Sequence, residues 1–354
     1  MGHAGRMAVW ANRRGVRGAR AAWLAGASWL LLLVLVLGGA QLVPSGASTG
    51  EVGGGHRHPA GTRLVRGQAA PSPGPEAASP VMSGSGPPYG VALSSVRFDD
   101  LSRTTAARGT VPAAQGRLLV TDLFVPVGAS GPRPLVVFAH GWNSDPGVYA
   151  SLLEQWAAAG FLVAAPAFPD STDLYPGSPT SDYADQALDI SFVITSLLHD
   201  QAVPIDPTRI AVAGHSDGGT DVALMALDPT YADARVRAYI CMSGEMPSGV
   251  ASYTTTPTRA PLLVAVGSDD EYGLYPLTTQ VFQAAEAPAE AMLVEPGGDH
   301  LGSFVDATPA AAAMREAETQ FLELALEPVA PTSAAIDAAL AEPAAGSLQV
   351  VPAP

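Results

Sequence analysis

The stretch Arg209-Ile-Ala-Val-Ala-Gly214-His215-Ser216-Asp217-Gly218-Gly219-Thr220 decides the fold of this chain. The apolar run that ends at Ala213 predicts a buried strand, and residues 218–226 predict a helix. Gly-x-Ser-x-Gly between a strand and a helix places the serine on a sharp turn, where only glycine neighbours let the backbones pass so closely. The helix directs the positive end of its dipole toward Ser216. We therefore predict that Ser216 is a nucleophile rather than part of a plain glycine-rich loop.

Outside this turn, short apolar runs alternate with helical stretches. Most runs are continuously apolar, as expected for strands buried on both faces of a parallel sheet. The alternation predicts an α/β fold with a mostly parallel central sheet and helices on both faces. The predicted strands are Leu118–Val125, Pro134–Ala139, Phe161–Ala167, Arg209–Ala213, Ala238–Met242, Pro261–Val266 and Ala291–Val294. The predicted helices are Tyr149–Ala159, Asp182–His199, Gly218–Ala226, Pro276–Ala285 and Ala310–Leu326.

The predicted helix at residues 182–199 is amphipathic. Ala184, Leu188 and Phe192 share one face, which we expect to lie on the sheet. The other face carries acids, which we expect to be solvated and to which we assign no function. These acids are Asp182, Asp185 and Asp189.

Two further segments carry a resemblance to a known family. Pro134-Leu-Val-Val-Phe-Ala-His140-Gly141-Trp142 is a strand followed by a His-Gly turn, and residues 149–166 form a helix followed by a strand. Together with the serine turn, they make residues from about 117 to 327 resemble the α/β-hydrolases. Within that superfamily, the chain is most similar to lidless esterases of the dienelactone-hydrolase, cutinase and polyester-hydrolase type. The resemblance implies an oxyanion hole made by the backbone N–H groups of Trp142 and Asp217.

A serine nucleophile needs a base and an orienting carboxylate, which follow it in this fold in the order acid, then histidine. His300 is the only histidine after Ser216, and we predict that it is the base. The earlier histidines have structural interpretations: His140 in the oxyanion turn, His199 at a helix end, and His215 in the serine turn, packed beneath the sheet. The Trp142 indole either walls the acyl pocket or is simply packed.

The acid has several candidates, because the strand at residues 261–266 is followed by three consecutive carboxylates. The resemblance favours Asp270 by its spacing from Gly267, with Asp269 and Glu271 as alternatives. Asp299 adjoins the histidine, but its position does not match the family. The carboxylate of Asp217 is expected to point away from the oxyanion hole, toward solvent.

The segment Ser243–Ala260 is too short for the helical cap of many lipases. No large cap domain is therefore expected, and an open cleft would suit an exposed or polymer-borne ester. Polyester hydrolases usually place a tryptophan just after the preceding strand, and cutinase-like enzymes carry a disulfide. Here that position reads Ser243-Gly-Glu-Met-Pro-Ser, and Cys241 is the single cysteine. Both departures argue against polyester specificity.

The two ends of the chain differ from its middle. Residues 1–20 contain five arginines and no acid, and residues 21–43 carry no charge. This pattern predicts export through either a cleaved signal peptide or an uncleaved membrane anchor. Residues 44–90 are rich in Gly, Pro, Ser and Ala and are expected to form a flexible spacer. A catalytic domain is predicted at 91–327 and an Ala/Pro-rich tail at 328–354.

Charge and cysteine content exclude several functions. The net charge is −15, with 18 arginines and no lysine, which argues against nucleic acid as a partner. One cysteine excludes an intramolecular disulfide and a thiolate-rich metal site. No metal or organic cofactor is expected.

The sequence therefore predicts an extracytoplasmic serine hydrolase that cleaves carboxylic esters through an acyl-enzyme, with Ser216, His300 and Asp270 as its triad. One alternative is the same triad acting on a thioester or amide. The other alternative is a membrane-tethered binding protein that keeps the fold without activity. The complete set of serine, acid and histidine favours an enzyme.

Overall fold

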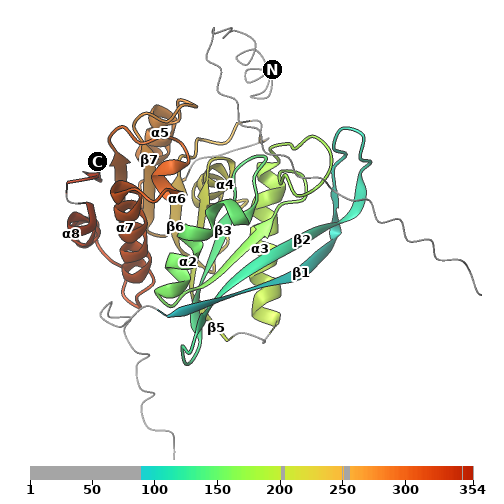
Figure 1. Cartoon of the computed structure of the whole chain (residues 1–354), viewed down its shortest axis with the longest axis horizontal. Coiled ribbons are helices and arrows are strands. Elements are labelled where there is room, and N and C mark those ends of the chain that lie inside the picture. Colours follow the sequence, from blue (N-terminus) through green and yellow to red (C-terminus); the bar gives the residue numbers. More distant parts are fainter. Residues whose placement is uncertain (1–88, 201–203, 249, 251–255, 345, 354) are drawn as a thin grey trace, which may run out of the picture. The chain divides into compact units, whose positions relative to one another are not determined.

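A nine-stranded sheet runs through the protein in the order β1-β2-β4-β3-β5-β6-β7-β8-β9 (Figure 1). The structure is a computed structural model that describes residues 89–200, 204–248, 250, 256–344 and 346–353. The strands from β4 through β8 in that order are mutually parallel. The antiparallel pairs β1–β2, β2–β4 and β8–β9 complete the two edges. The predicted α/β class and mostly parallel sheet are confirmed.

Each strand and helix predicted from the sequence is present. The strands are β1 (Gly90–Thr105), β2 (Ala114–Val127), β3 (Arg133–Ala139), β4 (Leu162–Ala167), β5 (Ile205–His215), β6 (Val236–Met242), β7 (Leu262–Gly267), β8 (Glu290–Glu295) and β9 (Gln349–Pro352). The helices are η1 (Pro146–Tyr149), α2 (Ala150–Ala158), α3 (Tyr183–His199), α4 (Asp217–Leu227), α5 (Tyr275–Ala285), α6 (Gly302–Val305), α7 (Pro309–Ala325) and α8 (Ser333–Ala344).

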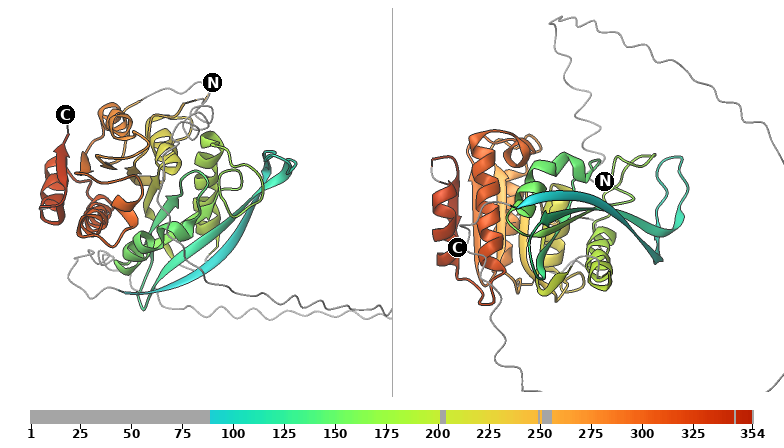
Figure 2. Two further views of the ribbon diagram at one scale, coloured as in Figure 1. Left: turned by 45° about the horizontal axis from the view of Figure 1, so that its top comes forward. Right: turned by 60° about the horizontal axis from the view of Figure 1, so that its bottom comes forward.

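Helices cover both faces of the sheet, as predicted (Figures 1 and 2). Helices α3, α4 and α5 pack on one face, where Val193, Leu224 and Val281 are fully buried. Helices α2, α6, α7 and α8 cover the other face, where Trp156 and Phe321 are fully buried. Strands β3 and β7 are buried along their whole length, so the loops at their carboxyl ends start from a rigid base.

Strand β1 and helix α6 are elements that the sequence did not predict. Strands β1 and β2 form a long antiparallel ribbon in which Gly90 pairs with Val127 and Thr105 pairs with Ala114. The ribbon runs along one edge of the molecule (Figure 2). Strand β1 is mostly exposed, so it lacks the continuous apolar run of the inner strands.

The prediction of a C-terminal tail from residue 328 is wrong. Helix α8 packs against α7 and buries Ile336 and Leu340 completely. Strand β9 then pairs with β8, with Val351 opposite Met292. Alanine is the strongest helix former, so an Ala-rich segment with a few apolar anchors can extend the core despite its simple composition. The described residues from 89 onward belong to one compact unit.

The predicted faces of α3 are also wrong. Ala187 and Ile194 are fully buried, whereas Leu188, predicted to lie on the sheet, is 40% exposed. Asp189, predicted to be solvated, has no exposed surface, while the Asp185 side chain stays 46% exposed. The buried face of the helix therefore includes part of the acidic row.

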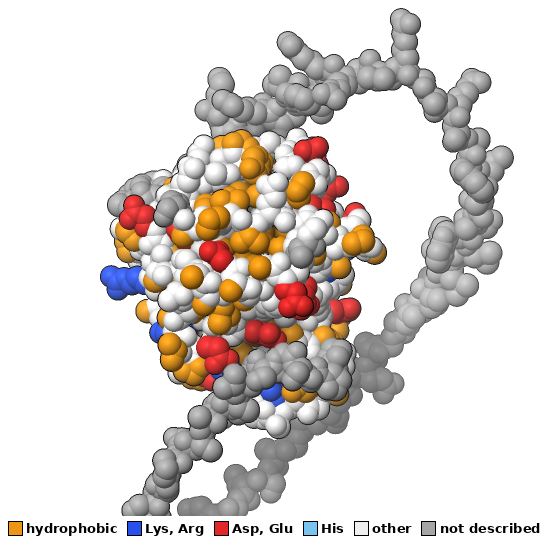
Figure 3. All heavy atoms as spheres, turned by 90° about the vertical axis from the view of Figure 1, so that its left-hand side faces the viewer, with side chains coloured by type: hydrophobic (Ala, Val, Ile, Leu, Met, Phe, Trp, Pro, Cys, Tyr) orange, Lys and Arg blue, Asp and Glu red, His pale blue; other side chains and the backbone are white. Residues whose placement is uncertain are grey.

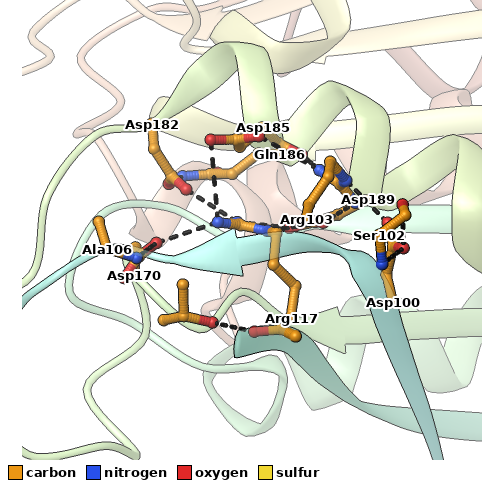
Figure 4. A network of polar contacts seen from close by, with 12 residues as sticks. Asp100, Ser102, Arg103, Ala106, Arg117, Asp170, Asp182, Asp185, Gln186 and Asp189 are labelled. Carbon is orange, nitrogen blue, oxygen red and sulfur yellow. Dashed lines mark hydrogen bonds and ion pairs between the residues drawn. The ribbon is translucent and has the colours of Figure 1, made fainter. Parts of the chain in front are cut away.

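A buried ion network explains this orientation (Figure 4). Its centre is Arg117 on β2, which has no exposed surface. The Arg117 guanidinium bonds Asp189 through Nε at 2.9 Å and through Nη2 at 2.6 Å. It also bonds Asp182 at 2.8 Å and Asp170 at 3.0 Å. Arg103, near the end of β1, donates to Asp189 as well. The network thus fastens α3 to the β1–β2 ribbon.

The connection from β6 to β7 contains no helix among its described residues, 243–248, 250 and 256–260. This agrees with the prediction that a large cap is absent. The predicted export or anchor segment at 1–43 and residues 44–88 of the predicted spacer lie outside the described residues. Of the helices that are described, none is both long and apolar enough to cross a bilayer.

Candidate active site

Ser216 occupies the turn between β5 and α4. Its φ of 58° and ψ of −120° form a backbone conformation that residues other than glycine rarely adopt, and such strain is typical of functional turns. A Cβ on Gly214 would lie 2.2 Å from the Gly218 carbonyl oxygen, and one on Gly218 would lie 2.1 Å from that of Ala139. Both positions therefore require glycine. The Ser216 N–H donates to the Met242 carbonyl at 3.0 Å, which ties the turn to β6.

The turn after β3 lies directly against Ser216. A Cβ on Gly141 would be 3.0 Å from the Ser216 Cβ. The Gly141 N–H donates to the Tyr149 hydroxyl at 3.2 Å. The Asn143 N–H donates to a backbone carbonyl in the loop after β4 at 2.8 Å. These two bonds hold the backbone on either side of Trp142, whose N–H is the predicted oxyanion donor.

His140 holds the same turn from within the core. Its Nε2 accepts from the Phe168 N–H at 3.0 Å, and its Nδ1 lies 2.8 Å from the Gly141 carbonyl oxygen. Burial lowers the pKa of His140 to about 4, so the ring is neutral and its Nδ1–H donates to the carbonyl. The side chain of Trp142 is 42% exposed, so it is not packed into the core.

The structure brings His300 and Asp270 together. The Nδ1 of His300 lies 2.7 Å from Oδ2 of Asp270, and both residues are buried. Burial by itself raises the pKa of Asp270, but the hydrogen bond and charge of His300 outweigh it and hold that pKa below its ordinary value. The Tyr272 N–H donates to the same carboxylate at 3.0 Å. An ionised acid that orients an imidazole is the arrangement that a serine nucleophile needs.

The alternative acids have other partners. The Asp269 carboxylate accepts from the Ser268 hydroxyl at 3.1 Å. The Glu271 carboxylate accepts from the backbone N–H of His300 at 3.0 Å, so it holds the histidine loop and not the ring. Asp299 accepts from the Gly302 N–H at 2.5 Å, at the start of α6.

Two aromatic rings lie close to the His300 imidazole. The His215 ring lies 4.5 Å from it and the Tyr272 ring 4.7 Å, measured between centroids. His215 is buried, as predicted, and its Nδ1 lies 3.0 Å from the Tyr149 hydroxyl. Sequence reasoning did not single out Tyr149 or Tyr272. The only signal for Tyr149 was its place at the head of the segment that resembles the family.

The prediction that the carboxylate of Asp217 points toward solvent is wrong. It accepts hydrogen bonds from the hydroxyls of Ser181 and Tyr183, the latter at 3.3 Å. These contacts turn it toward the start of α3. The N–H of Asp217, the predicted second oxyanion donor, belongs to the first residue of α4, where helix N–H groups point out of the helix end.

Within the described part of the chain, no group of three or more His, Cys, Asp and Glu side chains could hold a metal ion. Cys241 is buried beneath the Ser216 turn, where its Sγ lies 3.3 Å from the Gly219 carbonyl oxygen. Burial raises the pKa of this thiol to about 12, so it is not a thiolate nucleophile.

Comparisons with known proteins bear on the fold and on the part of the chain around Ser216. A family model described as Chlorophyllase matches residues 108–257, which include Ser216 and the Gly141 turn but end before Asp270 and His300. A solved ferulic acid esterase from Streptomyces cinnamoneus matches with a TM-score of 0.54 and 20% identity, over 70% of this chain and 95% of that chain. No curated protein matches. The strand order and the structural match identify the α/β-hydrolase fold, as the sequence predicted. The family-model match indicates a carboxylesterase-type hydrolase.

Proposed function

We propose that the protein hydrolyses carboxylic esters through an acyl-enzyme on Ser216. The observation that carries the proposal is the bond of 2.7 Å from His300 to Asp270, made beside a strained Gly-x-Ser-x-Gly turn. The match to the Chlorophyllase family model and the structural likeness to a ferulic acid esterase support esters over amides or thioesters.

The chemistry follows from the roles of the three side chains. His300 Nε2 takes the proton from the Ser216 hydroxyl as its oxygen attacks the ester carbonyl carbon. The carbonyl oxygen becomes an oxyanion, for which the N–H groups of Trp142 and Asp217 are the proposed donors. His300 then gives its proton to the departing alcohol, which leaves the acyl group on Ser216. A water molecule then attacks the acyl-enzyme, with His300 again as the base, and the carboxylic acid product leaves Ser216. Throughout, Asp270 holds the imidazole in one tautomer and stabilises its cation.

The surroundings of Ser216 favour a neutral ester that approaches from an open side. No helix stands among the described residues between β6 and β7, and the Tyr272 and Trp142 side chains are 58% and 42% exposed. Residues 91–330 carry 29 acids against 10 arginines. Acidic groups outnumber basic ones on the face formed by α5, α7 and α8 (Figure 3). Such a field disfavours anionic substrates.

We further propose that residues 1–43 direct export, because five arginines precede an uncharged run. Sequencing the N-terminus of the mature protein would distinguish a cleaved signal, which removes this segment, from an anchor, which retains it. An unprocessed protein recovered from the soluble cytoplasm would contradict the proposal.

The activity is tested with p-nitrophenyl esters of graded acyl length and the matching amides. Ser216→Ala and His300→Ala should each lower kcat by at least about a thousandfold. Ser94→Ala, on exposed β1, and His199→Ala, at the end of α3, are the matched controls and should retain wild-type rates. A wild-type protein no faster than Ser216→Ala would refute esterase activity and favour a binding protein. Faster turnover of amides than of esters would reassign the substrate class.

A further inference from the structure

A buried chain of hydrogen bonds joins the three backbone segments that meet at the site. It starts at the Gly141 N–H in the oxyanion turn, passes through the Tyr149 hydroxyl and the His215 ring, and ends at the His300 carbonyl. We propose that Tyr149 and His215 are positioning residues that hold the oxyanion turn and the base loop in register with Ser216. The inference rests on the proposed function, because it assigns these residues a part in the same reaction.

The direction of each bond in the chain follows from its ends. The His300 carbonyl oxygen can only accept, so the Nε2 of His215, 2.8 Å away, carries a proton. Burial, followed by the nearby His300, lowers the pKa of His215 to about 3, so the ring is neutral and its Nδ1 accepts. The Tyr149 hydroxyl must then donate to Nδ1 at 3.0 Å, which leaves its oxygen to accept from the Gly141 N–H. Every donor in the chain has one acceptor.

This chain of hydrogen bonds holds backbone groups that take part in the proposed reaction. Tyr149 holds the amide that precedes Trp142, the proposed oxyanion donor, and a Cβ on Gly141 would contact both Ser216 and the Tyr149 hydroxyl. His215 immediately precedes the nucleophile in sequence and bonds the backbone of the base. A displacement of about 1 Å at a reacting group can cost about a hundredfold in rate. We therefore expect loss of the chain to reduce turnover and leave substrate binding nearly intact.

Tyr149→Phe removes one hydroxyl and keeps the ring that packs 4.7 Å from Phe138. Its kcat for a p-nitrophenyl ester should fall about 10- to 100-fold, while KM stays within about twofold. Tyr239→Phe is the matched control. Its buried hydroxyl donates to the Met225 carbonyl at 3.4 Å, away from the site loops. The control should lose a similar amount of stability and none of its kcat.

A series at His215 provides the rescue. The side-chain N–H of glutamine can take the place of the Nε2–H that bonds the His300 carbonyl, whereas leucine has no donor. His215→Leu should therefore lower kcat more than His215→Gln. Equal losses in the two variants, or equal kcat in Tyr149→Phe and Tyr239→Phe, would overturn the inference.

A spectroscopic measurement keeps the inference testable if the protein hydrolyses no ester. Nitrogen-15 NMR of labelled histidine in the full chain should show His215 in one neutral tautomer, with the proton on Nε2. Tyr149→Phe should leave the proton on Nε2, because the His300 carbonyl still accepts it, but should shift the Nδ1 signal of His215, which loses its hydrogen-bond donor. It should also shift the signals of His300, whereas Tyr239→Phe should change neither residue. A wild-type His215 that carries its proton on Nδ1, or that exchanges tautomers, would refute the chain. The absence of ester turnover would refute the proposed function instead.

Discussion

Two buried polar networks in this protein solve different problems. The one at the site joins Tyr149, His215 and backbone groups, and all its members are neutral. The one behind the β1–β2 ribbon consists of charged groups: Arg117 lies fully buried against Asp170 and Asp189. A neutral network costs little desolvation and fixes the direction of every hydrogen bond. A charged network depends on all of its partners, because each charge has been removed from water.

The difference matches what each network holds in place. At the site, the network spans loops whose relative positions must hold to within about 1 Å. At the ribbon, the network attaches α3 to β2 and to the mostly exposed edge strand β1. Even with the hydrogen bonds and charge of Arg117, burial raises the pKa of Asp189 to about 6. We conclude that the neutral network serves geometry and the charged one serves attachment.

The largest expected effect comes from breaking the pair at the site. Asp270→Asn should lower kcat by about a thousandfold to ten-thousandfold, because an amide cannot hold the imidazole in the productive tautomer or stabilise its cation. Asp269→Asn, one residue earlier, is the control and should change kcat by less than about twofold, since its carboxylate bonds Ser268. Steady-state rates on a p-nitrophenyl ester provide the measurement. If Asp269→Asn were the more damaged variant, the assignment of the acid would be reversed.

Breaking the charged network should act on stability instead of on kcat. Arg117→Met leaves buried carboxylates without their cation and should lower the free energy of unfolding by about 3–5 kcal/mol. Arg209→Met removes a partly exposed pair with Asp206 and should cost no more than about 1 kcal/mol. Urea unfolding of both variants, with kcat measured on the folded fraction, separates the two effects. An Arg117→Met protein as stable as the wild type would mean that the network is dispensable for attachment.

Glu318 on α7 differs from the acids of both networks, because its two carboxylate oxygens are buried without a hydrogen-bond partner. Burial raises its pKa to about 8, although the charge of Arg315 opposes the shift. The folded state then holds a proton that the unfolded state releases above about pH 4.5, so stability should fall as pH rises from about 5 to 8. Each pKa unit corresponds to about 1.4 kcal/mol, so the loss should reach several kcal/mol.

Glu318→Gln should remove this loss and make the protein more stable than the wild type at pH 8. Glu316→Gln, an exposed position on the same helix, should leave the pH profile of the wild type unchanged. Thermal unfolding at a series of pH values measures both variants. A wild-type profile that is flat between pH 5 and 8 would show that Glu318 is not buried as a neutral acid.

The sequence predicted the parts of the molecule that depend on neighbours along the chain. The turn at Ser216 needs glycines at Gly214 and Gly218, and an inner strand such as β7 is apolar throughout. The three carboxylates after β7 are adjacent in sequence, so the candidates for the acid were few. The resemblance already favoured Asp270 by its spacing, and in the structure Asp270 is the one that contacts the His300 ring.

What the sequence did not predict depends on partners far along the chain. Arg117 and Asp189 are 72 positions apart, and Tyr149 and His215 are 66 apart. Periodicity within a helix cannot reveal that an arginine on a distant strand turns the helix toward it. The sequence did not predict strand β9 for the same reason, because β9 is defined by its pairing with β8.

The smallest expected effect tests which face of α3 lies on the sheet. Leu188 is 40% exposed, so Leu188→Gln should change the free energy of unfolding by no more than about 0.5 kcal/mol. Ala187, the preceding residue, is fully buried, and Ala187→Gln would force a larger polar side chain into the core at a cost of about 1–3 kcal/mol or more. Urea unfolding of this adjacent pair isolates orientation from composition, because both variants place glutamine on the same helix. If Leu188→Gln were the more destabilised, α3 would lie on the sheet through its apolar stripe. The ion network around Arg117 would then not be what orients it.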